Sequence, residues 1–204
     1  LGIPTTQDES VYRFASEILA SGRLYADSPP DRAFYTTNLV INDGRWYSQY
    51  FIGWPLLLAP FSAIGAPGLA NPVYAAASVP AVFLTVRQAL GSLPARFAAL
   101  LFASAPLTVL AAGTQLSHPA TLFWLCWVAA LASLGRTDGR PALAAGLAVA
   151  FCGAFFTRPT TALLDMRPSG YDNTAAIVLE LIYLLCLMTG YLIVTAAMFL
   201  YVEE

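Results

Sequence analysis

Four polar side chains near apolar segments have residue types that could take part in chemistry. Asp8 and Glu9 are neighbours in a polar segment, His118 is the only histidine of the chain, and Arg158 ends an apolar run. A carboxylate can act as a general base or hold a metal ion, while arginine and histidine can hold phosphate oxygens. These residue types could therefore serve in acid–base catalysis, in metal binding or in phosphate binding.

Each of these residues also has a structural interpretation. Asp8 can favour a helix N-terminus electrostatically, an effect of about 0.3 to 1 kcal/mol. Glu9 can complete a capping box with Thr6. His118 can be an ordinary polar anchor at a membrane interface. The aliphatic part of the Arg158 side chain can lie in the apolar region while its guanidinium reaches the interface. For Glu9 and His118 neither interpretation is preferred, whereas phosphate contact is preferred for Arg158.

The composition is that of a membrane protein. Of 204 residues, 58% are hydrophobic and 11% are charged, whereas soluble domains carry about a quarter of charged residues. The net charge of −2 provides no basic surface, which excludes nucleic acid as a partner.

The three cysteines lie in apolar runs without a zinc-like pattern and are interpreted as packing residues. The sequence has no glycine-rich phosphate loop, Ser/His/Asp set or HExxH helix, so nucleotide hydrolysis and proteolysis have no support.

Residues 1–50 form a polar segment that has no apolar run long enough to cross a membrane. Apolar residues at helical spacing predict an amphipathic helix on the membrane surface. Thr6 and Glu9 predict a capping box at its start, Gly22 predicts its end, and Asn-Asp-Gly at 42–44 predicts a turn. The apolar side of the helix is Val11, Phe14, Ala15, Ile18 and Leu19, and the other side is Arg13, Ser16 and Glu17.

The remainder is predicted to be an all-α, polytopic transmembrane helical bundle, with the amphipathic helix beside it on the outer face. Residues 51–70 are apolar but broken by glycine and proline, so we expect a re-entrant or interfacial hairpin. Residues 71–164 are expected to form a four-span bundle, and residues 165–204 a loop and a last, longest span. The spans are expected at about 71–90, 96–114, 119–134, 141–158 and 174–202.

Arginines between the spans predict the orientation. Two connectors are each flanked by a pair of arginines, and the positive-inside tendency places both connectors in the cytoplasm. Residues 1–50, the Thr114–His118 turn and Arg158 then share the outer face, provided that residues 51–69 do not cross the membrane. The flanking arginines are Arg87 and Arg96 for one connector and Arg136 and Arg140 for the other.

Three polar positions together resemble a known family. Asp8-Glu9 opens the amphipathic helix, which runs to Ser21-Gly22-Arg23-Leu24, and residues 44–57 carry aromatic residues and Gly-Trp-Pro. Gln-Leu-Ser-His at 115–118 and Thr-Arg-Pro at 157–159 stand at the outer ends of two spans. In order and spacing these positions resemble the polytopic GT-C glycosyltransferases related to protein O-mannosyltransferases and the bacterial aminoarabinose transferase. The resemblance covers about residues 7–160.

The resemblance implies an enzyme that transfers a sugar, with inversion, from a polyprenyl-phosphate donor within the membrane lipid to an acceptor of the cell envelope. It implies a bacterial-type inner membrane with an extracytoplasmic active face. Asp8, with Glu9, would be the catalytic carboxylate, and a divalent metal ion held by Asp8 and His118 is the cofactor to expect. His118, Arg158 and Gln115 would bind the donor phosphate. Tyr47, Tyr50 and Trp54 would line a substrate groove, although an aromatic belt at the bilayer interface is the default explanation for them.

The resemblance ends near residue 160, and residues 165–204 match nothing in the family. Family members begin with a cytoplasmic tail and a first span and continue through many more, so the sequence is expected to be an amino-terminal fragment that is inactive alone. The sugar and the acceptor stay open. So do two other functions: a non-catalytic accessory subunit of a membrane complex, and a transporter-like protein, which predicts charged residues deep inside spans.

Overall fold

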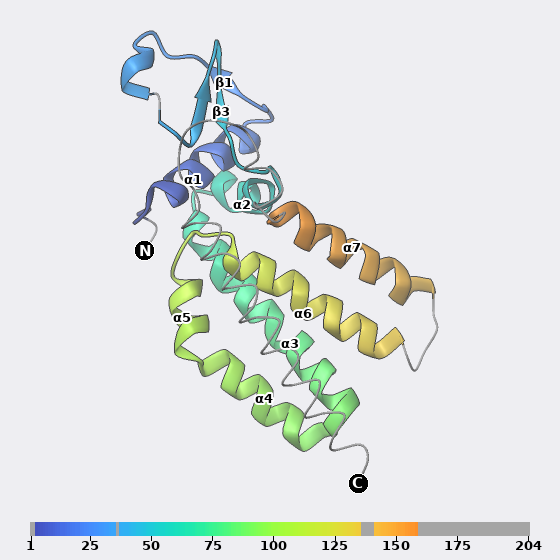
Figure 1. The fold of residues 1–204 in the computed structure, drawn as a ribbon. Helices are drawn as coiled ribbons and strands as arrows, with labels where there is room; N and C mark the ends of the chain where they lie inside the picture. The colour runs from blue at the N-terminus through green and yellow to red at the C-terminus, as the bar shows by residue number, and fades with distance from the viewer. Residues whose placement is uncertain (1–2, 36, 136–140, 159–204) are drawn as a thin grey trace. The chain divides into compact units, whose positions relative to one another are not determined.

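The structure is a computed structural model that describes residues 3–35, 37–135 and 141–158. These residues are mostly helical, with a small antiparallel sheet inserted between the first two helices (Figure 1). The predicted last span and its loop, at 165–204, lie outside the described residues. The helices are α1 (Gln7–Ala20), α2 (Gly53–Ala63), α3 (Ala70–Leu90), α4 (Ser92–Ser104), α5 (Pro106–Ala112), α6 (His118–Gly135) and α7 (Pro141–Thr157).

Helix α1 begins and ends where the sequence predicts. The Thr6 side chain accepts a hydrogen bond from the Glu9 backbone N–H, and the Glu9 side chain accepts one from the Thr6 backbone N–H, which confirms the capping box. The helix ends at Ala20, and Gly22 follows with a φ of +75°, a conformation that glycine adopts at little cost.

The packing of α1 differs in part from the expected amphipathic pattern. Val11 and Ile18 belong to the predicted apolar side and are each 7% exposed, in a helix that packs against α2. Ser16, which the helical pattern placed on the polar side, is fully buried. Its hydroxyl lies 2.7 Å from the hydroxyl of Ser62 in α2, and this hydrogen bond allows a polar group to be buried.

The prediction of an all-α fold is wrong for residues 26–48, which hold a three-stranded antiparallel sheet. Its strands are β1 (Ala26–Asp27), β2 (Val40–Asn42) and β3 (Arg45–Ser48), in the order β1-β3-β2. The predicted turn at 42–44 is confirmed, because it joins β2 to β3 and Gly44 has a φ of +106°. The strands are two to four residues long, too short to produce a clear period-two pattern in the sequence.

Residues 51–70 form helix α2 and a 3-10 helix at Pro67–Leu69 that leads into α3. Helix α2 has 11 residues, so it is roughly 16 Å long at a rise of about 1.5 Å per residue, which is too short to cross a hydrocarbon core of about 30 Å. Trp54 and Leu58 of α2 form a buried cluster with Ala70 and Ala120. This cluster fastens α2 to the start of α3 and α6.

Among the described residues, two helices are long and apolar enough to cross a membrane, Pro67–Leu90 and His118–Gly135. Helices α4 and α5 make a third if they count as one bent span. The continuous span expected at 96–114 is broken, because α4 and α5 meet at an angle of 50°. Ala105 has an extended ψ of 128° and Pro106 begins α5. Proline disfavours helical geometry in the residue before it, which explains the break. Helix α7 is apolar, with 17 residues.

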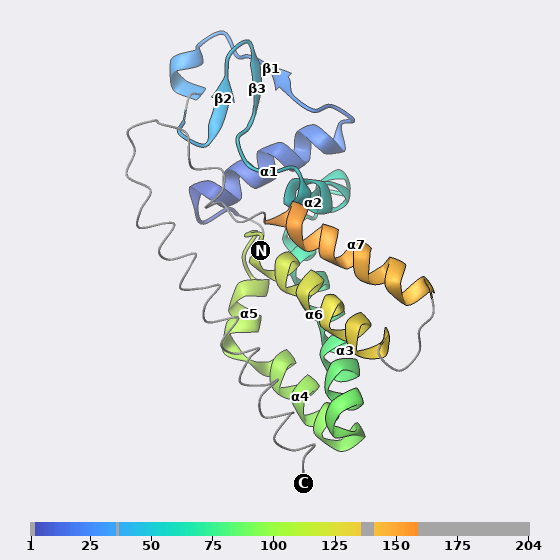
Figure 2. The ribbon, with the colours of Figure 1, turned by 45° about the vertical axis from the view of Figure 1, so that its right-hand side comes forward.

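Helix α3 packs against α4 and α6, and α6 packs against α7 (Figures 1 and 2). Many large apolar side chains on the outer sides of these helices are exposed, among them Leu100, Leu107 and Phe151. Exposed apolar surface of this kind suits contact with lipid. Helix α1 and the sheet lie at the end where α3 and α6 begin and α7 ends.

Candidate functional site

Asp8 lies in the first turn of α1, where Tyr50 holds it. The Tyr50 hydroxyl donates a hydrogen bond of 2.7 Å to Asp8 Oδ1, and the Tyr12 ring packs against the Tyr50 ring with centroids 4.7 Å apart. Burial, reinforced by the Asp8 carboxylate, raises the pKa of Tyr50 well above its ordinary value. The hydroxyl therefore stays protonated at neutral pH and remains a donor. Asp8 is half-buried, and its bond to Tyr50 leaves Oδ2 available.

Glu9 has a different environment from its neighbour. It is only 2% exposed, and both of its carboxylate oxygens accept hydrogen bonds. Oε2 accepts from the Thr5 hydroxyl at 2.7 Å and the Thr6 backbone N–H at 3.1 Å, and Oε1 accepts from the Gln115 backbone N–H at 2.7 Å. Burial raises the pKa of Glu9, but the hydrogen bonds together outweigh burial and the net pKa is lowered. Glu9 is thus an ionised, enclosed carboxylate, which favours its structural interpretation.

Side chains from three helices fix the loop that carries Gln115 and His118. Besides the Glu9 bond, the Trp54 indole N–H donates to Gln115 O at 2.9 Å. The Asn71 side-chain amide donates to Thr114 O at 2.7 Å and to Leu116 O at 2.9 Å. Asn71 is 1% exposed. Sequence reasoning missed Asn71, although a polar amide at the start of an apolar helix is a signal for such a clamp.

Arg158 follows the last residue of α7, at the point where α7 meets α2. The contact is close because α2 has Gly53 there: a Cβ at that position would lie 2.0 Å from Phe156 O and 2.7 Å from Thr157 N. Trp54, the next residue, is the one that holds Gln115. The contacts therefore connect the Asp8-Glu9 pair, the loop at 114–118 and the end of α7. Arg158 and His118 are both half-buried.

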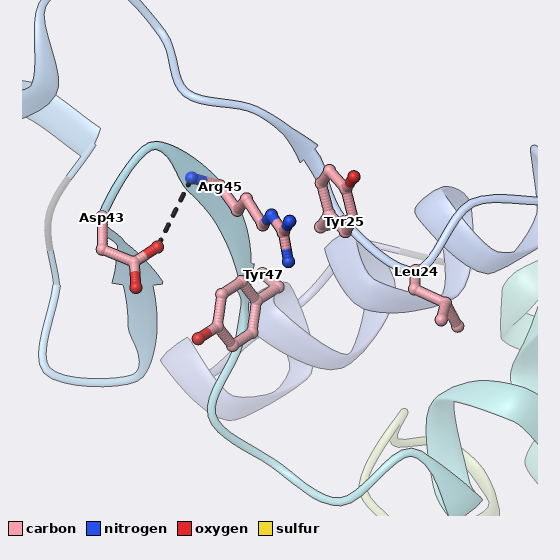
Figure 3. A pocket seen from close by; sticks show the side chains of 5 residues that line it. All are labelled: Leu24, Tyr25, Asp43, Arg45 and Tyr47. Carbon is pink, nitrogen blue, oxygen red and sulfur yellow. Dashed lines mark hydrogen bonds between the residues drawn. The ribbon is translucent and has the colours of Figure 1, made fainter.

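The three aromatic residues expected in one substrate groove lie in three different environments. Tyr50 contacts Asp8, as described above. Trp54 is 0% exposed and packs in the buried cluster, and its indole N–H holds the loop through Gln115 O. Tyr47 lines a separate pocket on the sheet, with Leu24, Tyr25, Asp43 and Arg45 (Figure 3).

Asp8 and His118 do not belong to a larger group of metal-binding side chains in the described part of the chain. No group of three or more His, Cys, Asp or Glu side chains gathers there. Asp8 and His118 would supply two protein ligands at most, and one Asp8 oxygen is already occupied by the Tyr50 hydroxyl. These two side chains could hold a divalent ion together with substrate phosphate oxygens or water, so the metal ion stays a prediction.

Comparison with known proteins does not identify the chain. No protein-family model matches it, and neither a curated protein nor a solved structure matches it significantly.

Proposed function

We propose that this chain is part of a membrane glycosyltransferase that transfers a sugar from a polyprenyl-phosphate donor to an acceptor outside the cytoplasm. The observation that carries the proposal is the hydrogen bond of 2.7 Å between Glu9 and Gln115, which are 106 positions apart. It joins the first and second polar positions of the GT-C-like pattern. The contact of Gly53 with the end of α7 adds the third position, beside Arg158.

Asp8 would be the general base in this reaction. Its carboxylate would accept the proton of the acceptor hydroxyl as the hydroxyl oxygen attacks the anomeric carbon of the sugar. The bond between that carbon and the phosphate oxygen would break, and the configuration would invert. Tyr50 supports this role because its hydroxyl orients the carboxylate through Oδ1, while Oδ2 has no hydrogen bond within the described residues.

Arg158 and His118 would hold the polyprenyl phosphate as it leaves. The guanidinium group suits a phosphate because its planar fork donates paired hydrogen bonds. Glu9 would be a positioning residue, since both of its oxygens are occupied and it is buried. It would keep Asp8 and the loop that carries His118 at one end of the bundle.

The test is transfer from a panel of labelled polyprenyl-phosphate sugars by the protein expressed in membranes from its full reading frame. Asp8→Asn removes the base and keeps the side-chain shape, so we expect transfer to fall by at least about 100-fold. Asp31→Asn is the matched control because Asp31 is exposed and lies outside the site. Full activity of Asp8→Asn would remove the proposed base, and no transfer by folded wild-type protein from any donor would overturn the proposed function.

A further inference from the structure

The outer face of the sheet has an open pocket whose lining is suited to a charged ligand. Trp46 of β3 packs against Phe14 of α1, with ring centroids 4.3 Å apart. Because neighbouring residues of a strand point to opposite faces, Arg45 and Tyr47 lie on the face away from α1. The hairpin pocket, defined by Leu24, Tyr25, Asp43, Arg45 and Tyr47, has a volume of about 360 Å³, at the small end of the range of about 300–1,000 Å³ typical of ligand sites.

Arg45 is placed in this pocket as a cation without a carboxylate partner. Its guanidinium carbon lies 4.6 Å from the centre of the Tyr25 ring, which holds the group by a cation–π contact. In the described residues no ion pair includes Arg45, whereas Arg13 bonds Glu17 at 2.9 Å. The Asp43 carboxylate is directed at the Arg45 backbone N–H, at 3.4 Å (Figure 3). The N–H groups of the guanidinium are therefore available to a ligand.

We propose that the hairpin pocket binds a saccharide that carries an oxyanion, such as a carboxylate. Arg45 binds the oxyanion through its fork of N–H donors. The ring of Tyr47, which Figure 3 shows across the guanidinium from Tyr25, packs against the apolar C–H face of the sugar. The Asp43 carboxylate accepts hydrogen bonds from sugar hydroxyls. The inference does not depend on the proposed transferase activity, because it concerns binding alone.

Calorimetric titration of the full chain in detergent tests the proposal with three probes. Glucuronate has the ring and the oxyanion, glucose has only the ring, and acetate has only the oxyanion. We expect saturable binding of glucuronate, at least ten times tighter than that of glucose or acetate. Binding should weaken in higher salt because the pocket is open and the charges are screened. Equal binding of glucose would overturn the role of the oxyanion, equal binding of acetate would overturn the role of the sugar, and no binding of glucuronate would overturn the site.

Two substitutions locate the binding in the pocket. Arg45→Gln should weaken glucuronate binding by at least tenfold, and Tyr47→Ala should weaken it several-fold. Arg23→Gln is the matched control, because Arg23 is an exposed arginine of the same polar segment that faces Asp27 at 3.8 Å. Circular dichroism shows whether each variant is folded. Unchanged affinity in a folded Arg45→Gln variant would refute the assignment, and if that variant does not fold, Tyr47→Ala and the three probes decide it.

Discussion

Replacing Glu9 by Gln tests whether the enclosed carboxylate holds helix α1 against the loop at 114–118. Glu9 accepts hydrogen bonds from Thr5 and Thr6 on one oxygen and from the Gln115 backbone on the other. The amide of Gln has one acceptor oxygen and an NH₂ group in place of the second. The NH₂ group must therefore face either the donors of Thr5 and Thr6 or the backbone N–H of Gln115. The donors that it faces lose their acceptor.

The size of the effect follows from these contacts. Leaving a buried donor without a partner costs about 1–3 kcal/mol, and the remaining hydrogen bonds weaken because their acceptor is no longer charged. We expect Glu9→Gln to lower the free energy of unfolding by about 2–4 kcal/mol, which corresponds to a fall in Tm of roughly 5–15 °C for a chain of this size. Glu17→Gln is the control on the same helix: its ion pair with Arg13 is exposed and contributes less than about 0.5 kcal/mol.

Thermal unfolding in detergent, followed by tryptophan fluorescence, gives the Tm of the wild type and of both variants. The pH dependence gives a second readout, because the pKa of Glu9 is lowered in the folded state. A lowered pKa adds stability that is complete above the ordinary value of 4.5 and is lost as pH falls through the folded pKa. The Tm difference between wild type and Glu9→Gln should thus be constant near neutral pH and shrink below 4.5. Equal melting of Glu9→Gln and Glu17→Gln at pH 7 would refute the reasoning.

Three further predictions follow from single contacts. Tyr50→Phe removes the donor that orients Asp8, so kcat for sugar transfer should fall about tenfold at unchanged KM, the effect of about 1.4 kcal/mol; an unchanged kcat would remove the positioning role. Gly53→Ala puts a Cβ 2.0 Å from Phe156 O and should cost about 1–3 kcal/mol in a melting experiment, whereas Gly135→Ala, with open space around it, should melt close to wild type. In a background without native cysteines, an impermeant thiol reagent applied to intact cells should label Asn38→Cys and spare Ser92→Cys; labelling of both, or only of Ser92→Cys, would contradict the predicted orientation.

Local signals in the sequence predicted the ends of α1 well. The capping box at Thr6 and Glu9 and the glycine at Gly22 depend on residues within one helical turn. The break before Pro106 also has a local cause, but the apolar character of 96–114 concealed it. Ser16 was misplaced because its partner, Ser62, belongs to another helix. A helical pattern assigns faces, but it does not show which polar group will find a partner when it is buried.

The candidate site depends still more on contacts between distant residues. Asp8, Glu9, Gln115 and Arg158 could be selected by residue type and by resemblance, but their different roles could not. The bond of Glu9 to Gln115 joins residues 106 positions apart, and the clamp by Asn71 reaches over 40 positions, to Thr114 and Leu116. No periodicity encodes such contacts. They result from the packing of α2, α3 and α6 around Trp54.

The two adjacent carboxylates are therefore expected to have different roles, Glu9 in the stability of the fold and Asp8 in the transfer reaction. Consecutive residues of a helix point about 100° apart, so Glu9 can face the protein interior while Asp8 faces Tyr50. Their environments differ accordingly: Glu9 is enclosed by donors on both oxygens, whereas Asp8 has one donor and is half-buried. Neighbouring carboxylates in different environments are a common basis for different roles. Substitution of Glu9 should thus reduce stability, and with it any activity, while substitution of Asp8 should reduce transfer in a protein that still melts near the wild-type temperature.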